Sequence, residues 1–330
     1  LLVTNIGTNA LFGAISGSAV ATVAAIGGMT IPAMKDEGYD PDYSAALSSA
    51  ASLLGPMIPP SITLIVYAGL TEASVQKLFL ATLTPAILCT VAFLAYTLWY
   101  GKKKNLPKQP KKTAKEAGKI MLDAIWALLL PVIVLGLIFS GATTVTEAAA
   151  VSCLYSAVVS LFIYKTITFK DLLKILGDSA VSIAAIMILV GMSKATAYVV
   201  ISSQMPQLFM DFITSITDSR FVVLLIINVI FLILGCLMEG NCIIVMMVPL
   251  LLTLVKSFGI DLLQFGVMSA INIYIGCITP PVGVSLLLGC KLGKTSVGGT
   301  FKAILPFFAI SMVILILVTY WPSFTLWLIH

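Results

Sequence analysis

The chain has 330 residues, of which 59% are hydrophobic and 10% are charged, whereas soluble domains carry about 25% charged residues. This composition excludes an ordinary soluble protein. It predicts an all-α polytopic membrane protein in a lipid bilayer, because backbone groups must be paired inside lipid and no alternating barrel strands are visible. The formal net charge of +5 comes mostly from one lysine-rich loop, so it does not indicate a nucleic-acid partner. With His330, the C-terminal residue, as the only histidine, Ser-His or Cys-His catalysis has almost nothing to work with.

Six apolar runs have roughly the 20 residues that a helix needs to cross the bilayer. They are 78–100, 121–140, 143–164, 179–201, 220–238 and 303–321. The loop at 101–120 holds eight lysines, and the positive-inside rule places it in the cytoplasm. Counting crossings from this loop returns the chain to the cytoplasm at Lys165, Lys170 and Lys174.

Two polar spots and two proline pairs interrupt the apolar runs in the same order. "GAISGSA" (13–19) precedes "GPMIPPS" (55–61), and "GCLMEGN" (235–241) precedes "GCITPPVG" (276–283). The separation between Gly55 and Gly276 equals the separation between the first and the second Pro-Pro pair. We call this separation the repeat offset. We interpret each set as a re-entrant hairpin followed by a broken helix.

The two Pro-Pro segments cross the membrane in opposite directions when the crossings are counted from the lysine loop. This predicts an inverted-topology repeat, which is typical of secondary transporters. We expect transport-domain elements in residues 1–70 and 220–292, connecting and scaffold helices in 71–219, and a C-terminal helix in 293–330. The repeat offset also places the start of the first repeat roughly 100 residues before Leu1, so we expect about three further helices there.

A helix broken within a membrane leaves carbonyl and N–H groups free, and these are tolerated only beside protein or a water-filled cavity. Free carbonyls joined by hydroxyls suit Na⁺, whereas half-helix N-termini suit an anionic group. The alternative is a proline-kinked packing helix with small residues at close contacts. The predicted sodium-binding residues are Ser16, Gly17, Ser18, Gly55, Ile58, Met238, Gly240, Gly276 and Thr279.

The predicted substrate-binding residues are Ser18, Ser61, Glu239 and Asn241. A carboxylate at membrane depth is costly and usually functional, and three roles are open for Glu239: bonding a polar substrate, exchanging a proton, or bracing the hairpin tip.

Other charged residues and the cysteines receive structural interpretations. Glu147 follows Thr144 and Thr146 and indicates a helix N-terminus, and Glu72 indicates a charge in a first helical turn near an interface. Lys194 has no assigned role. The six cysteines (89, 153, 236, 242, 277 and 290) lie in apolar runs without a CxxC spacing, which favours buried packing thiols over disulfides or a metal site.

The motifs resemble the large membrane subunit of tripartite ATP-independent periplasmic (TRAP) transporters, the DctM-like permeases. The resemblance covers the first hairpin and broken helix (13–61), "TTVTEAAAV" (143–151), and the second hairpin and broken helix (235–283). It implies a Na⁺-coupled importer of an organic acid in the bacterial inner membrane, working by an elevator motion, with no cofactor beyond the coupling ion.

The resemblance also implies two partners, a small membrane subunit and a periplasmic substrate-binding protein. The substrate would be a carboxylate such as a C4-dicarboxylate, a sugar acid, a keto acid or sialic acid. The family's carboxylate at the second hairpin tip maps to Glu239, its substrate-facing serines to Ser18 and Ser61, and its sodium-binding loop carbonyls to Gly55 and Gly276. Two alternatives stay open: a single-component Na⁺/carboxylate symporter, and an intramembrane enzyme using Ser18 or Glu239.

Overall fold

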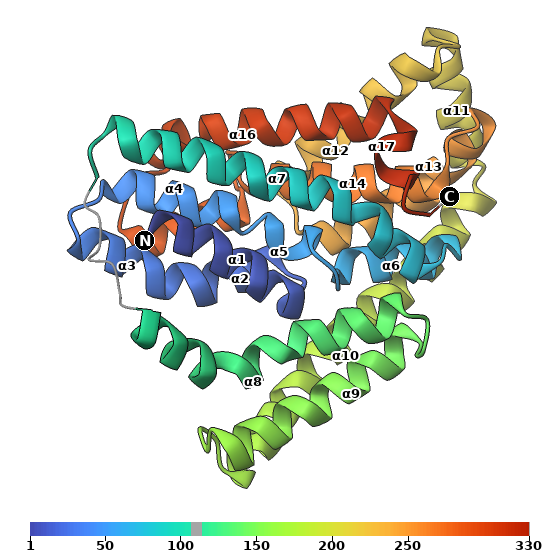
Figure 1. Cartoon of the computed structure of the whole chain (residues 1–330). Helices are drawn as coiled ribbons and strands as arrows, with labels where there is room; N and C mark the ends of the chain where they lie inside the picture. The colour runs from blue at the N-terminus through green and yellow to red at the C-terminus, as the bar shows by residue number, and fades with distance from the viewer. Residues whose placement is uncertain (107–113, 330) are drawn as a thin grey trace. The chain divides into compact units, whose positions relative to one another are not determined.

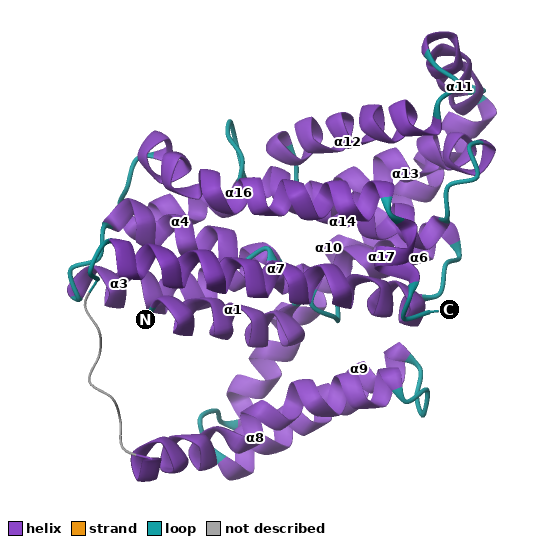
Figure 2. Cartoon of the chain, turned by 45° about the horizontal axis from the view of Figure 1, so that its top comes forward, coloured by secondary structure: helices purple, strands orange, loops and turns teal. Residues whose placement is uncertain are grey.

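The computed structural model describes residues 1–106 and 114–329, and across them every regular element is a helix (Figures 1 and 2). The elements are α1 (Leu2–Ser16), α2 (Ala19–Thr22), the π-helix η1 (Val23–Gly27), α3 (Gly28–Asp36), α4 (Pro41–Ala51), α5 (Leu54–Met57), α6 (Ile62–Thr71), α7 (Val75–Lys103), α8 (Ala114–Phe139), α9 (Val145–Val158), the π-helix η2 (Val159–Ile163), α10 (Phe169–Ser202), α11 (Met205–Ile216), α12 (Arg220–Leu237), α13 (Gly240–Ser257), α14 (Leu262–Cys277), α15 (Val284–Gly293), α16 (Val297–Tyr320) and α17 (Pro322–Leu326).

Eight helical segments within the described ranges are long and apolar enough to cross a membrane. The longest, Pro41–Thr71, includes the first interrupted helix, and the predicted runs 78–100 and 303–321 fall within α7 and α16 or overlap them. Many large apolar side chains on these helices are exposed, including Val181 and Phe162, as expected where lipid replaces water. The chain is therefore a multi-pass membrane protein, as its composition predicts.

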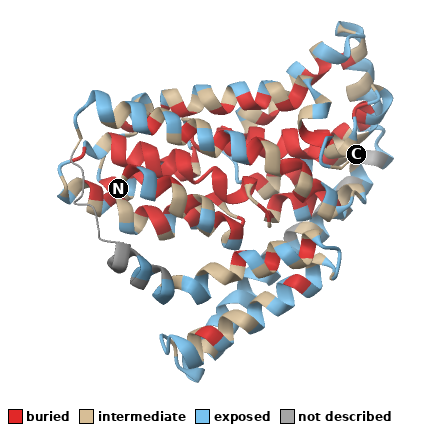
Figure 3. Cartoon of the chain, in the orientation of Figure 1, coloured by how far each residue is buried: buried red, intermediate tan, exposed pale blue. Residues whose placement is uncertain are grey.

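The chain forms two compact units, and the larger one comprises residues 1–107 and 193–330. Within it α1 packs on α4, α5 and α7, whereas α12 packs on α14, α4 on α15 and α16, and α6 on α13. Buried side chains follow these contacts through the middle of the unit (Figure 3). The largest fully buried ones include Tyr67, Phe79, Phe93, Phe231 and Phe265.

Helix α7 is attached to the rest of this unit through its N-terminal half and its C-terminal end. The Tyr100 ring stacks on Tyr43 of α4 with 3.9 Å between ring centroids, and the Trp327 indole N–H donates to the Thr84 hydroxyl at 2.8 Å. Residues 71–106 and 193–219 thus share one compact unit with both interrupted helices, although they lie in the predicted scaffold range. The assignment of transport and scaffold parts stays a prediction.

The two helix interruptions occur where the proline pairs predict them. The first separates α5 from α6 at residues 58–61, and the second separates α14 from α15 at residues 278–283. Both Pro-Pro peptide bonds are cis. Side-chain caps begin the helices after Ser18, Ser61 and Glu239, where each side chain accepts a backbone N–H of the following turn.

The smaller unit comprises residues 108–192 and contains α8, α9, η2 and most of α10. Thr144 and Glu147 form a capping box at the start of α9, so the predicted helix N-terminus is confirmed with Thr144 as the cap. The Tyr155 and Tyr164 hydroxyls donate to the carbonyls of Trp126 and Asp123 at 2.7 Å each, which ties α9 and the end of η2 to α8.

The structure corrects two local predictions. Glu72 ends α6 in the left-handed region at φ 59°, and the following helix begins with Ser74 as its cap, so Glu72 is not a first-turn charge. The cysteines are free, as expected, but Cys153 is exposed and Cys242 half-buried. Residues 107–113 of the lysine loop and the side chain of Lys194 lie outside the described part of the structure.

Candidate ligand site at the two helix interruptions

A small cavity of about 40 Å³ lies where the two interruptions meet the tips of the helix pairs α1–α2 and α12–α13. Its walls come from four stretches of the larger unit: Gly17, Ser18, Ala19 and Val20; Pro56, Ile62 and Thr63; Glu239, Gly240 and Asn241; and Tyr274, Cys277 and Val284. This volume accommodates an ordered water or a small ion. It is far smaller than the pocket that a drug-sized ligand fills.

The first tip concentrates oxygen atoms around Gly17 and Ser18. The Ser16 hydroxyl lies 3.1 Å from that of Thr22, and the Thr22 hydroxyl donates to the Ser18 carbonyl at 2.7 Å. Gly17 has φ 61°, and a Cβ there would meet the Pro60 carbonyl oxygen. The tip therefore lies directly against the first Pro-Pro segment.

Each helix pair packs against its interrupted helix through one close glycine–glycine contact. A Cβ on Gly13 would lie 2.6 Å from Gly55 Cα, and one on Gly235 would lie 3.1 Å from Gly276 Cα. Small residues at such points let helix backbones approach closely in membranes. The predicted residues Gly55 and Gly276 thus occupy equivalent packing positions, although neither belongs to the cavity wall.

Glu239 braces the second tip, which is one of the three roles that its sequence leaves open. Its carboxylate accepts from the backbone N–H groups of Asn241 and Cys242, at 3.0 and 3.4 Å, and from the Asn241 side-chain amide at 3.0 Å. The Asn241 amide oxygen in turn accepts from the Thr63 hydroxyl at 3.0 Å. Asn241 therefore connects the second tip to α6 across the cavity.

Ser61 is fully buried rather than exposed to the cavity. Its hydroxyl lies 3.2 Å from the Tyr274 hydroxyl and caps α6 by accepting from Leu64 N at 3.5 Å. Thr279 donates its hydroxyl to the Ile275 carbonyl at 2.8 Å. Met238 is extended and 37% exposed, and Ile58 is extended at the start of the first interruption.

The structure brings only part of the predicted residue set to the cavity wall. Gly17, Ser18, Glu239, Gly240 and Asn241 line the cavity together. The others lie beside it or behind it: Ser16, Gly55, Ile58, Ser61, Met238, Gly276 and Thr279.

Sequence reasoning missed Thr63 and Tyr274, two polar wall residues. The available signals were a threonine within the first turn after the Ser61 break and a tyrosine two residues before Gly276 in an apolar run.

The described wall of the cavity contains a single charged side chain. Among its described residues there is no Lys, Arg or His, and Glu239 supplies the one carboxylate. Across the described ranges no group of three His, Cys, Asp or Glu side chains could hold a metal ion. Hard cations prefer hydroxyl and carbonyl oxygens as ligands, whereas many transition metals prefer imidazole or thiolate ligands. This set of oxygen ligands therefore fits an ion such as Na⁺.

Comparison with known proteins decides the family. The DctM component of the tripartite ATP-independent periplasmic transporter matches residues 1–324 of this chain. The chain belongs to the DctM family of TRAP transporters. This assignment confirms the resemblance carried by the two hairpin motifs and the two Pro-Pro motifs.

Several TRAP permeases are similar over nearly the whole chain. The sialic acid TRAP transporter large permease protein of Vibrio cholerae is 35% identical over 98% of this chain and 75% of its own length. The C4-dicarboxylate TRAP transporter large permease protein of Pseudomonas aeruginosa is 38% identical over 96% of this chain and 74% of its own. The 2,3-diketo-L-gulonate TRAP transporter large permease protein of Escherichia coli is 32% identical over 95% and 74%, respectively.

Proposed function

We propose that this chain is the large permease subunit of a Na⁺-coupled TRAP importer for an organic acid. Membership of the DctM family across residues 1–324 carries the proposal, and the substrates named for these three relatives are all organic acids or their anions. The family consists of transporter permeases, which argues against the intramembrane enzyme. The tripartite family name supports two partners, a small membrane subunit and a periplasmic substrate-binding protein.

The arrangement of oxygen atoms supports Na⁺ as the coupling ion. The cavity would have to widen to admit an organic acid, and its described wall holds Glu239 and no basic side chain. Two negative charges would then meet in a medium of low dielectric constant. A cation bound at the first tip, among the Ser16 and Thr22 hydroxyls and the Ser18 carbonyl, would offset this repulsion. Cation and substrate would then bind together, which is the requirement for symport.

Two packing features support the inverted-topology repeat. The Gly13–Gly55 contact and the Gly235–Gly276 contact recur at nearly the repeat offset. Leu53 and Tyr274, which the same offset pairs, line one shared apolar space. Residues related by a two-fold axis meet only near that axis, so this pairing is expected if the axis passes between α5 and α14.

An elevator motion would move both helix pairs and both interrupted helices as one body. The stacking of Tyr100 on Tyr43 of α4 favours including α7 in that body. On this proposal the moving body would extend beyond the predicted boundary at residue 71. We propose the bacterial inner membrane as the location, because a periplasmic partner delivers substrate from that side.

The test is uptake by proteoliposomes that contain the chain, the small membrane subunit and the binding protein. We expect accumulation of a radiolabelled acid only with an inward Na⁺ gradient. Equal uptake in K⁺-only buffer would exclude Na⁺ coupling, and full uptake without the binding protein would instead favour the single-component symporter.

Two variants probe the predicted substrate contacts. We expect Glu239→Gln and Ser18→Ala to reduce uptake more than they reduce thermal stability, because both residues line the cavity. A variant that folds and transports like the parent removes that residue from the proposed site.

A further inference from the structure

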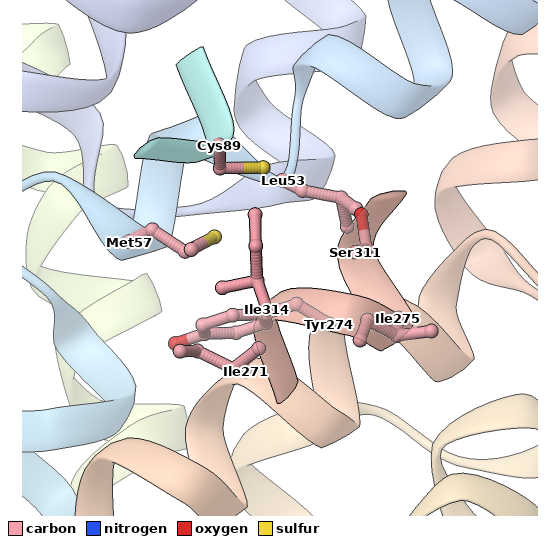
Figure 4. A pocket seen from close by; sticks show the side chains of 8 residues that line it. All are labelled: Leu53, Met57, Cys89, Ile271, Tyr274, Ile275, Ser311 and Ile314. Atoms are coloured by element: carbon pink, nitrogen blue, oxygen red, sulfur yellow. The ribbon is translucent and has the colours of Figure 1, made fainter. Parts of the chain in front are cut away.

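Tyr274 lies between the ligand cavity and an apolar space behind it, and lines both. Its side chain is only 5% exposed. Figure 4 shows its ring among apolar side chains that include Met57 of the first interrupted helix and Ile314 of α16. The space among these side chains is too small for a water molecule, so packing fixes the orientation of the ring.

The Tyr274 hydroxyl is the polar end of this otherwise apolar arrangement. It lies 3.2 Å from the Ser61 hydroxyl, and Ser61 begins α6 as its cap. Two positions later, Thr63 lies in the cavity wall and donates to Asn241. The Tyr274 hydroxyl therefore anchors, through Ser61, the helical turn that presents Thr63 to the cavity.

This anchor exists on one side of the molecule only. The repeat offset pairs Tyr274 with Leu53, Ser61 with Val282 and Thr63 with Val284. The apolar partners cannot form the corresponding hydrogen bonds. The side of the cavity formed by α6 and the second tip thus carries the polar side chains of Thr63, Glu239 and Asn241. On the other side, Ser18 is the one hydroxyl-bearing wall residue, beside Ala19, Val20 and Val284.

We propose that Tyr274 is a positioning residue of the substrate site: through the buried Ser61 hydroxyl it sets the first turn of α6, and with it Thr63, in the geometry that receives the polar end of the organic acid. The inference rests on the proposed transport function. A single hydrogen bond of this kind contributes modestly, so its loss weakens apparent substrate affinity by about threefold to tenfold. Turnover changes little, because the Tyr274→Phe ring still fills the same apolar space.

The experiment measures initial uptake rates in proteoliposomes with the complete transporter, using radiolabelled succinate, N-acetylneuraminate and 2,3-diketo-L-gulonate as probes. It compares the parent, Tyr274→Phe, Ser61→Ala and the double variant. We expect a higher KM for Tyr274→Phe with Vmax within about twofold of the parent. Because Tyr274 acts through Ser61, the double variant should show the KM of Ser61→Ala alone.

Tyr67→Phe is the matched control. Tyr67 is also a buried tyrosine whose hydroxyl makes a hydrogen bond, to the Leu262 carbonyl at 2.6 Å, but it is not part of the cavity wall. Its KM should equal that of the parent. The inference is overturned if Tyr274→Phe keeps the parental KM, if its effect multiplies with that of Ser61→Ala, or if Tyr67→Phe raises KM equally.

Two further outcomes are kept separate. If the parent accumulates none of the three acids under a Na⁺ gradient, the proposed function itself fails, and the inference fails with it. If Tyr274→Phe does not elute as a folded protein in detergent, the variants of Ser61 provide the test. Ser61→Cys adds a small volume and keeps a weak donor, so its KM should fall between those of the parent and Ser61→Ala. Parental KM values in both serine variants overturn the inference.

Discussion

The Gly13–Gly55 contact yields a sharp prediction, because both partners are backbone atoms. A Cβ on Gly13 would lie 2.6 Å from Gly55 Cα and 3.1 Å from its nitrogen and oxygen, whereas ordinary contact begins at 3.4 Å. No side chain can rotate to relieve this conflict, so Gly13→Ala requires α1 and α5 to separate by about 0.8 Å. Overpacking of this kind costs about 3 kcal/mol at the upper end of its usual range. The greater helix propensity of alanine returns about 1 kcal/mol.

Gly7→Ala is the matched control on the same helix. Nothing lies within 4 Å of a Cβ at that position, so alanine should stabilise α1 by up to about 1 kcal/mol. The two variants should differ by roughly 3 kcal/mol, or about 5 °C or more in the Tm measured by differential scanning fluorimetry in detergent. Equal Tm values would refute the reasoning, because they would mean that the close backbone approach contributes nothing.

Three further predictions concern the same unit. Lys35→Met removes the hydrogen bond of 2.8 Å that Lys35 Nζ donates to the Gly293 carbonyl at the C-terminal end of α15. We expect the free energy of unfolding to fall by about 1–2 kcal/mol, and an unchanged Tm would contradict this. Gln264→Met removes the buried side-chain amide that donates to the Val318 and Thr319 carbonyls at 3.0 and 2.8 Å. We expect the free energy of unfolding to fall by about 1–3 kcal/mol, and a Tm at or above that of the parent would argue against this. If Na⁺ binds at the first tip, NaCl should raise the Tm of the purified protein more than equimolar KCl does, and identical values would speak against the site.

The sequence was sufficient to predict the long apolar helices and the two interruptions, but not the shorter helices α11 and α17. Hydrophobic runs of about 20 residues locate membrane helices because lipid tolerates few unpaired polar groups, and α12 and α16 fall where such runs predict them. Proline cannot donate to a helical hydrogen bond, so the Pro-Pro pairs fix both breaks. The capping box at Thr144 was also predictable, because it depends on residues three positions apart.

The remaining features depend on contacts between distant parts of the chain. The Thr63–Asn241 hydrogen bond joins residues 178 positions apart, and no local pattern indicates it. The misreading of Glu72 has a different origin: Thr71, Glu72 and Ser74 all suit a helix boundary, and the structure selects Ser74, whose side chain accepts from Lys77 N to cap α7. Ser61 was expected to face the substrate, but the sequence does not show that Tyr274 occupies the position beside its hydroxyl.

The attachment of α7 through its N-terminal half and its C-terminal end makes this helix suitable for reporting movement of the larger unit. Its contacts at Tyr100 and Thr84 leave the side chains of Ile87 and Val91 exposed, at 62% and 57%. A spin label at Val91 would therefore follow any displacement of the larger unit without disturbing the cavity. Distances from this label to a fixed point in the membrane would reveal whether substrate and Na⁺ move the unit as a whole or only rearrange the two tips.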